Sequence, residues 1–184
     1  MATAGQSEGF PSEGSLHIGI FTCNYKPLIN GLTSSFEIFS REFRARGHRV
    51  SVFAPSYPGH EVPEEGVFRF PSLRVPTHHQ YALPLPYSPH IAALLPRLQL
   101  DLLHAQHPFL LGSFAHRAAR RLGLPLVFTH HTLYEEYAHY IPFLSGPARR
   151  MAIGLSVSFA NRADAVVAPT RGVRKLLLER GVSS

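Results

Sequence analysis

Short apolar runs alternate with helix-like stretches from Leu16 onward, and this alternation constrains the fold more than any other feature. Residues 16–21 (LHIGIF) form a run typical of a strand that is buried on both faces. Residues 50–54 (VSVFA) form a second such run. Between the two runs, apolar side chains recur at the spacing of an amphipathic helix, at Leu32, Phe36, Phe39 and Phe43. A strand, a helix and a strand in this order imply a right-handed crossover between parallel strands.

Capping residues predict where several helices begin and end. Ser34 and Glu37 have the spacing of a capping box, and Gly47 is suited to end the same helix in a left-handed conformation. Ser88 followed by Pro89 predicts the start of another helix, and Thr170 predicts the cap of the last one. Further strands are expected at 67–70, 101–105, 125–129 and 165–168, and further helices at 88–98, 108–122, 134–140, 147–161 and 171–180.

This rhythm predicts an α/β fold, a Rossmann-like, doubly wound and mostly parallel sheet with helices on both faces. Residues 16–184 are expected to form that domain, and residues 1–15, which are small, polar and rich in Gly and Ser, are expected to be a disordered tail. No apolar run approaches the roughly 20 residues of a membrane-spanning helix. The lone Cys23 excludes an internal disulfide, which suits a cytoplasmic protein.

The net charge of +6 is concentrated after Gly146. Seven basic residues stand there against Asp164 and Glu179: Arg149, Arg150, Arg162, Arg171, Arg174, Lys175 and Arg180. Such an end could face solvent, the phosphates of a nucleotide, or an anionic lipid surface, and solvent is the simplest interpretation. Nucleic acid is not an expected partner, because the basic residues do not interleave with a recognised motif.

In doubly wound sheets, ligands bind outside the carboxyl ends of the strands. That rule selects residues 22–31, 105–109, 130–140 and 169–172. In the first of these segments, Asn30 and Gly31 precede a predicted helix, whose free N–H groups and dipole favour an anion such as a phosphate. The alternative is a tight turn that needs Gly for its dihedral angles, which the pair by itself favours. The segment is not GxGxxG, which argues against a nicotinamide or flavin dehydrogenase.

Four histidines lie at two of these strand ends: His104, His107, His130 and His131. A transition metal is disfavoured, because His104 and His107 are separated by a transition from strand to loop and adjacent strand residues point to opposite faces. We therefore expect one residue of the pair His130-His131 to line the crevice and the other to pack inside the fold.

The segment after His131 is unusually aromatic. Tyr134, Tyr137 and Tyr140 recur every third residue, so on a helix they share one face. Such a stripe is more often part of a core. With Glu135 nearby and a strand end just before it, the segment could instead form the lip of a site for a sugar or glycerol.

Several of these segments resemble one protein family when taken in order. They are YKPLINGLTSSFEIFSREFRARGHRVSVFAP, Asp101-Leu-Leu-His104 with Pro108, Phe128-Thr129-His130-His131-Thr132, and ADAVVAPT at residues 163–170. Together they resemble the N-terminal domain of the family 4 retaining glycosyltransferases, which have the GT-B fold. Within that family, HTLYEEYAHYI is most similar to the diacylglycerol glucosyltransferases.

The resemblance implies two Rossmann-like domains, of which this chain would be the N-terminal, acceptor-side one, with the C-terminal donor domain absent. It implies no metal and no cofactor, only a nucleotide-sugar donor such as UDP-glucose. Asn30 and Gly31 would approach the donor pyrophosphate, and His131 would contact the transferred sugar. His107, Tyr134, Glu135, Tyr137 and Thr170 would line the substrate site, although relatives often carry an acidic residue near His107.

The implied partners are the chain's own donor domain, a nucleotide sugar, and an anionic membrane surface that holds a glycerolipid acceptor. The enzyme would then be cytoplasmic and peripheral at the inner face of the membrane. The sequence leaves open a second interpretation, a stand-alone module of the same fold that binds a nucleotide or sugar without catalysis.

Overall fold

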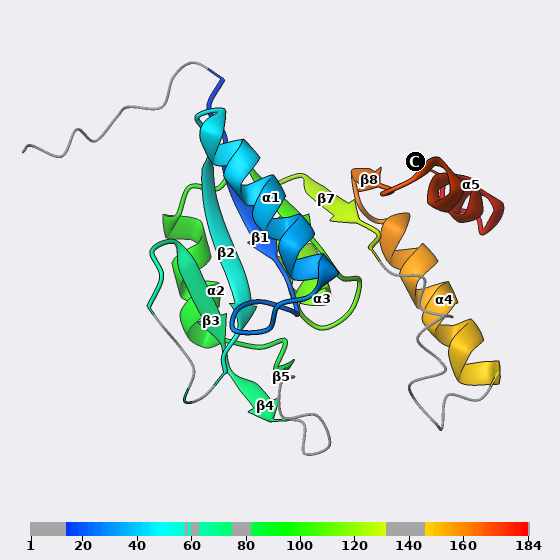
Figure 1. Cartoon of the computed structure of the whole chain (residues 1–184), viewed down its shortest axis with the longest axis horizontal. Coiled ribbons are helices and arrows are strands. Elements are labelled where there is room, and N and C mark those ends of the chain that lie inside the picture. Colours follow the sequence, from blue (N-terminus) through cyan, green and yellow to red (C-terminus); the bar gives the residue numbers. More distant parts are fainter. Residues whose placement is uncertain (1–13, 58, 60–62, 75–81, 132–145, 184) are drawn as a thin grey trace, which may run out of the picture.

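The computed structural model describes residues 14–57, 59, 63–74, 82–131 and 146–183. Figure 1 shows the elements along the chain: β1 (His17–Phe21), α1 (Gly31–Ala45), β2 (Arg49–Pro55), β3 (Val67–Phe70), β4 (Ser72–Arg74), β5 (Ala82–Pro84), α2 (Pro89–Leu94), η1 (Leu95–Arg97), β6 (Leu102–Ala105), α3 (Leu111–Leu122), β7 (Leu126–Thr129), α4 (Gly146–Ala160), β8 (Ala165–Val167) and α5 (Arg171–Glu179). Most of the predicted tail at 1–15, and all of the predicted helix at 134–140, lie outside the described residues.

The main sheet has six strands in the order β3-β2-β1-β6-β7-β8, and every neighbouring pair is parallel. The chain moves from β1 outward to β3 and then returns to place β6 on the other side of β1. This reversal between β1 and β6 is the topological switch point, where doubly wound folds bind their ligands. The predicted α/β, Rossmann-like class is therefore confirmed, and all strand ends that matter for the site lie at one edge of the sheet.

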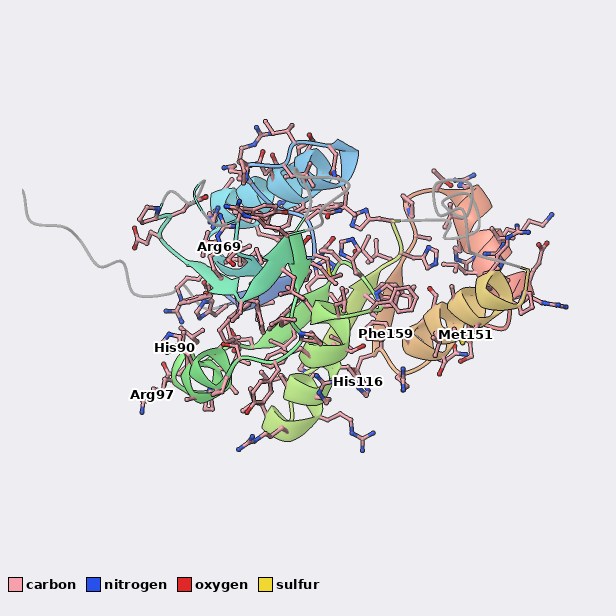
Figure 2. The ribbon with its side chains drawn as sticks, turned by 90° about the horizontal axis from the view of Figure 1, so that it is seen from below. Arg69, His90, Arg97, His116, Met151 and Phe159 are labelled. Carbon is pink, nitrogen blue, oxygen red and sulfur yellow. The ribbon has the colours of Figure 1, made fainter. Side chains whose placement is uncertain are left out.

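Helices cover both faces of the sheet. Helix α1 lies on one face, and α2 and α3 lie on the other, as the two views show (Figures 1 and 2). Under α2 and α3 lies the larger core cluster, in which the rings of Phe21 and Phe53 stack with centroids 4.3 Å apart. The smaller cluster lies under α1, where Phe36 packs among apolar residues of β1 and β2.

The first helix begins earlier than its capping box predicts. Asn30 is the cap, and its side chain accepts a hydrogen bond from the Thr33 backbone N–H (2.9 Å). The capping box at Ser34 and Glu37 is therefore wrong, because Asn30 satisfies the free N–H groups one turn sooner. Gly47 ends the helix as predicted, with φ +84°, and lets the next backbone N–H reach the Phe43 carbonyl.

Other predicted caps are confirmed. Ser88 caps α2 through the Ile91 N–H, and Thr170 caps α5 through the Val173 N–H. In addition, Gly123 ends α3 with φ +67°. Helix α3, however, begins at Leu111 and not at Pro108. The proline-rich stretch after β3 forms no helix in its described residues. It also contains the antiparallel pair β4–β5, which the sequence did not predict.

The last part of the described chain is anchored by Asn161. Its side-chain amide donates to the Gly181 carbonyl (2.8 Å), and its side-chain oxygen accepts from the Ser183 N–H (2.9 Å). Val182 is buried between these two contacts. The end of α5 is thus fixed against the end of α4.

Candidate functional site

The candidate site lies along the edge of the sheet where the parallel strands end. The loops after β1, β6, β7 and β8 all leave from this edge, since the strands are parallel. They carry the predicted residues Asn30, Gly31, His107, His131 and Thr170. Asn30-Gly31 and His131 are therefore at the same edge, with β6 between their strands.

Gly31 is the first residue of α1 and is exposed. Its φ is not in the left-handed region, and a Cβ added to it would meet no atom within 4 Å. The tight-turn alternative is therefore wrong, because neither the backbone nor the packing of the described chain requires Gly here. What remains is a helix N-terminus to which an outside group can come close.

The loop that leads into α1 is braced by charged and aromatic side chains. The Tyr25 hydroxyl donates to the Glu64 carboxylate (3.0 Å), and Lys26 pairs with Glu37 (2.9 Å). The Arg69 guanidinium, labelled in Figure 2, lies 4.8 Å from the centre of the Tyr25 ring. The N-terminus of α1 is thus held in place by contacts from β3 and from α1 itself.

His131 follows β7 and is held by a residue that sequence reasoning missed. Its Nε2 atom lies 2.5 Å from the side-chain oxygen of Gln106, which is only 1% exposed. Burial lowers the pKa of His131 to about 4, and the neighbouring His130 adds to the shift. The ring is therefore neutral near pH 7 and acts as a hydrogen-bonding group, not as a cation.

The adjacent His130 is buried, and its ring lies edge-on to Phe128 at 5.8 Å. His130 thus packs inside the fold, as predicted for one histidine of the pair, and His131 is partly exposed at the strand end. The predicted place of His131 in the crevice stays a prediction. His104 is also buried, and its Nε2 lies 2.7 Å from the Thr129 hydroxyl. His104 and His130 therefore belong to the framework beneath the site.

His107 connects the β6 loop to the β1 loop. Its Nδ1 accepts a hydrogen bond from the Cys23 backbone N–H (3.2 Å). Burial lowers the pKa of His107 to about 4, with a contribution from nearby His131. Because Nδ1 accepts, the proton of the neutral ring is on Nε2. His107 has a clear structural task, and its predicted contact with substrate stays a prediction.

Two backbone features shape the β6 loop, and sequence reasoning missed both. Leu110 has φ +50°, which is strained for a residue with a side chain. At Gly112, an added Cβ would lie 1.7 Å from the His107 carbonyl oxygen. Gly112 therefore lets α3 start directly against the loop that carries His107. A glycine at the fifth position of the helix predicted over 108–122 was the only available sequence signal.

Thr170 uses its hydroxyl to cap α5, so the structure gives it a structural role. Beside it lies a cavity of about 330 Å³ lined by Arg171, Arg174 and apolar residues of β8 and α5. The remaining predicted residues, Tyr134, Glu135 and Tyr137, lie outside the described residues.

Across the described ranges, no three His, Cys, Asp or Glu side chains are grouped so that they could hold a metal ion. No helix in the same ranges has both the length and the apolar character needed to cross a membrane.

Comparison with known proteins adds a family. Residues 29–184 match the model of Glycosyltransferase Family 4. An alpha-monoglucosyldiacylglycerol synthase of Streptococcus pneumoniae is 30% identical over 165 residues, which are 88% of this chain and 37% of that protein. The protein of the same name from Acholeplasma laidlawii is 26% identical over 86% of this chain and 42% of its own length.

A GDP-mannose-dependent alpha-mannosyltransferase of Mycolicibacterium smegmatis is 30% identical over 161 residues, which are 84% of this chain and 42% of that protein. The chain therefore spans about two fifths of the length of these curated relatives. The first two are named as glucosyldiacylglycerol synthases, and the third is named as a mannosyltransferase that depends on GDP-mannose.

Proposed function

Because this chain belongs to glycosyltransferase family 4, we propose that it is the acceptor-side, N-terminal half of a retaining enzyme that moves a hexose from a nucleotide sugar to an acceptor. A second α/β domain, the donor domain, supplies most of the nucleotide-sugar site. The family's chemistry needs a donor such as UDP-glucose as co-substrate, and no metal or other cofactor.

The open N-terminus of α1 is the observation that carries this proposal. Gly31 begins that helix beside the switch point of the sheet, with no described atom within 4 Å of the place where a Cβ would lie. A pyrophosphate bound there gains the helix dipole and the free backbone N–H groups. Asn30 holds the turn in which those groups are presented.

His131 contacts the transferred sugar in this proposal. A neutral imidazole can hydrogen-bond a sugar hydroxyl at lower desolvation cost than a charged group. We assign it a supporting role in binding and transition-state stabilisation, and not the role of a general base. His107, Thr170 and the segment with Tyr134, Glu135 and Tyr137 are proposed to line the same substrate site.

We propose a membrane glycerolipid such as diacylglycerol as the acceptor. Support comes from the two relatives that are named glucosyldiacylglycerol synthases. Arg149 and Arg150 are exposed on α4 next to Met151, which is 63% exposed and is labelled in Figure 2. Basic side chains beside exposed apolar ones suit an anionic lipid surface, where each basic residue adds about 1 kcal/mol. We accordingly expect a cytoplasmic protein, peripheral at the inner face of the membrane.

The decisive experiment assays the full-length protein with a panel of nucleotide sugars and with diacylglycerol in vesicles. Gly31→Val should weaken donor binding, because its side chain occupies the approach to the helix N-terminus. Gly146→Val is the matched control, since Gly146 also begins a helix and also has open space around its Cβ position. Equal donor affinity in the two variants would refute the phosphate role of Gly31.

His131→Ala in the same assay should lower turnover by about 10²-fold, comparable to the loss of one preorganised transition-state hydrogen bond. Unchanged turnover would remove His131 from the site. The stand-alone binding module predicts a different pattern, in which this chain alone binds nucleotide or sugar tightly in calorimetry and no transfer product forms with any donor.

The membrane part is tested by co-sedimentation with anionic vesicles at low salt. Charge reversal of Arg149 and Arg150 on α4 should release the protein. The same reversal of Arg120 and Arg121 on α3 is the control, because it changes the net charge equally on a different helix. Release by both pairs to the same extent would mean that only net charge matters, and the α4 surface would lose its role.

A further inference from the structure

Gln106 occupies a junction of three central strands. It directly follows β6, and its backbone N–H donates to the Phe21 carbonyl of β1 (2.9 Å). Its side chain reaches across to His131 after β7. Only 1% of the surface of Gln106 is exposed, so its amide is held in place by the sheet. Water therefore does not compete for its hydrogen bond to His131.

The polarity of this contact decides where the His131 proton lies. A carboxamide oxygen can only accept, so Nε2 of the ring must donate to it. In a neutral imidazole the other nitrogen, Nδ1, then carries the lone pair. Within the described part of the chain, no group hydrogen-bonds to that atom. The low pKa of the ring, caused mainly by burial, keeps it in this neutral form near pH 7.

The neighbouring rings are consistent with an uncharged setting. His107 accepts at Nδ1 from Cys23 and is neutral near pH 7, and burial likewise lowers the pKa of His104 to about 4. A neutral acceptor in such surroundings offers nothing to a phosphate or a carboxylate. It is complementary to a hydroxyl that donates a hydrogen bond.

We propose that Gln106 is the positioning residue for His131: its buried amide oxygen takes the Nε2 proton and leaves Nδ1 as an acceptor for a hydroxyl of the substrate. The hydrogen bond between Gln106 and His131 is observed in the structure and does not depend on the proposed function. Only the identity of the hydroxyl, on the transferred sugar or on the acceptor, rests on the proposed function. The pyrophosphate of the donor binds at the N-terminus of α1 in the proposed function, and not at His131.

The tautomer can be measured without any activity. Two-bond ¹⁵N–¹H NMR spectra of this chain at pH 7 should show His131 as a single Nε2–H tautomer. Gln106→Met keeps the length of the side chain but removes the acceptor, so the ring should become a mixture of tautomers. Gln106→Glu keeps the acceptor and should retain Nε2–H, while its carboxylate should raise the pKa of His131.

His48 is the internal control, because its Nδ1 accepts from the Leu16 N–H and its tautomer should not change in either variant. An Nδ1–H tautomer in the wild type would overturn the proposal, since the amide would then be turned to donate. An unchanged single tautomer in Gln106→Met would overturn it as well. If Gln106→Met does not fold, the NMR titration of Gln106→Glu decides, and an unchanged or lower His131 pKa contradicts the contact.

Turnover of the full-length protein separates this inference from the proposed function. Gln106→Met should lower turnover about tenfold, the value of one neutral hydrogen bond, and should have little effect when His131 is already Ala. Equal losses in both backgrounds would show that Gln106 acts elsewhere. A fixed tautomer together with full turnover in His131→Ala would refute the substrate contact and leave the hydrogen bond standing.

Discussion

The central strands β1 and β2 and the β8 edge of the sheet are built by the same rules but are packed very differently. At β1, α1 and β2, every residue of β1 is buried, and so is all of β2 except its first residue. At the edge, β8 has no fully buried residue, and α4 leaves Met151 63% and Leu155 49% exposed. Only the last turn of α4, with Phe159, enters the main core.

This difference indicates which part of the chain contributes most to the free energy of unfolding. Burial of apolar surface is the main favourable term in folding, so substitutions near β1 and β2 should unfold the domain, and substitutions on the outer part of α4 should not. The candidate site follows the strand ends from β1 to β8. Its α1 side therefore rests on the well-packed strands, and its Thr170 side rests on the weakly packed edge.

The largest expected effect is in the Phe21–Phe53 stack. Phe53→Ala should lower the free energy of unfolding by about 3–5 kcal/mol, because Phe53 is fully buried and leaves a cavity. Leu155→Ala on α4 should change it by less than about 0.5 kcal/mol. Urea unfolding measures both. Similar losses of unfolding free energy at the two positions would mean that the central strands and the β8 edge with α4 are equally important for stability.

The next effect concerns two glycines and should differ in sign. Gly112→Ala places a Cβ against the His107 carbonyl and should cost about 3 kcal/mol, the upper part of the usual range for overpacking. Gly154→Ala lies within α4 with open space around it and should stabilise by about 0.5–1 kcal/mol. Thermal unfolding checks both. A tolerated Gly112→Ala would show that α3 can move away from the loop.

The site histidines make stability depend on pH. His104, His107 and His131 have folded-state pKa values of about 4, below the ordinary value of 6.5. Between these values the unfolded chain binds more protons, so stability should fall as pH falls from about 6.5 toward 4. A fully buried ring such as His104 contributes about 1.4 kcal/mol per pH unit in that window.

Urea unfolding between pH 7 and pH 5 tests this dependence. The variant His104→Gln should have a lower free energy of unfolding at pH 7. The slope of that free energy against pH should also be smaller, by an amount equal to the uptake of at most one proton on unfolding. A slope that does not change on replacing His104 would assign the dependence to other groups.

The smallest effect contrasts two helix caps. Asn30→Ala and Thr170→Ala each remove one hydrogen bond to a helix N-terminus, worth about 1 kcal/mol. Asn30→Ala should lower the global stability, because α1 covers one face of the sheet. Thr170→Ala should mainly raise hydrogen exchange in α5, since local opening is easiest where few contacts are buried. Global destabilisation by Thr170→Ala would place α5 in the same cooperative unit as α1.

Much of the fold could be predicted because its signals are local. Apolar runs marked the six strands of the main sheet, and single residues such as Gly47, Ser88 and Thr170 marked helix ends. The start of α1 was missed because two cap signals overlap within eight residues, and the geometry of the loop chose Asn30. Strands β4 and β5 have three residues each, too few for a periodic pattern.

The site was predicted at the level of strand ends and not at the level of contacts. Parallel topology alone brings Gly31, His107 and His131 to one edge. The bond between Gln106 and His131 joins residues 25 positions apart and depends on the register of β6 against β7. The need for glycine at 112 depends on how close α3 lies to the β6 loop. Neither has a pattern that a single sequence displays.

The Asn161 clamp has a mechanical consequence. Both ends of its amide hold residues 181 and 183 beside the end of α4, so this stretch is fixed relative to that helix. If a second domain is joined there, the Asn161 side chain would restrict how that domain can rotate relative to the edge of the sheet. The variant Asn161→Ala would make that connection more flexible without changing any residue that is proposed to contact a substrate.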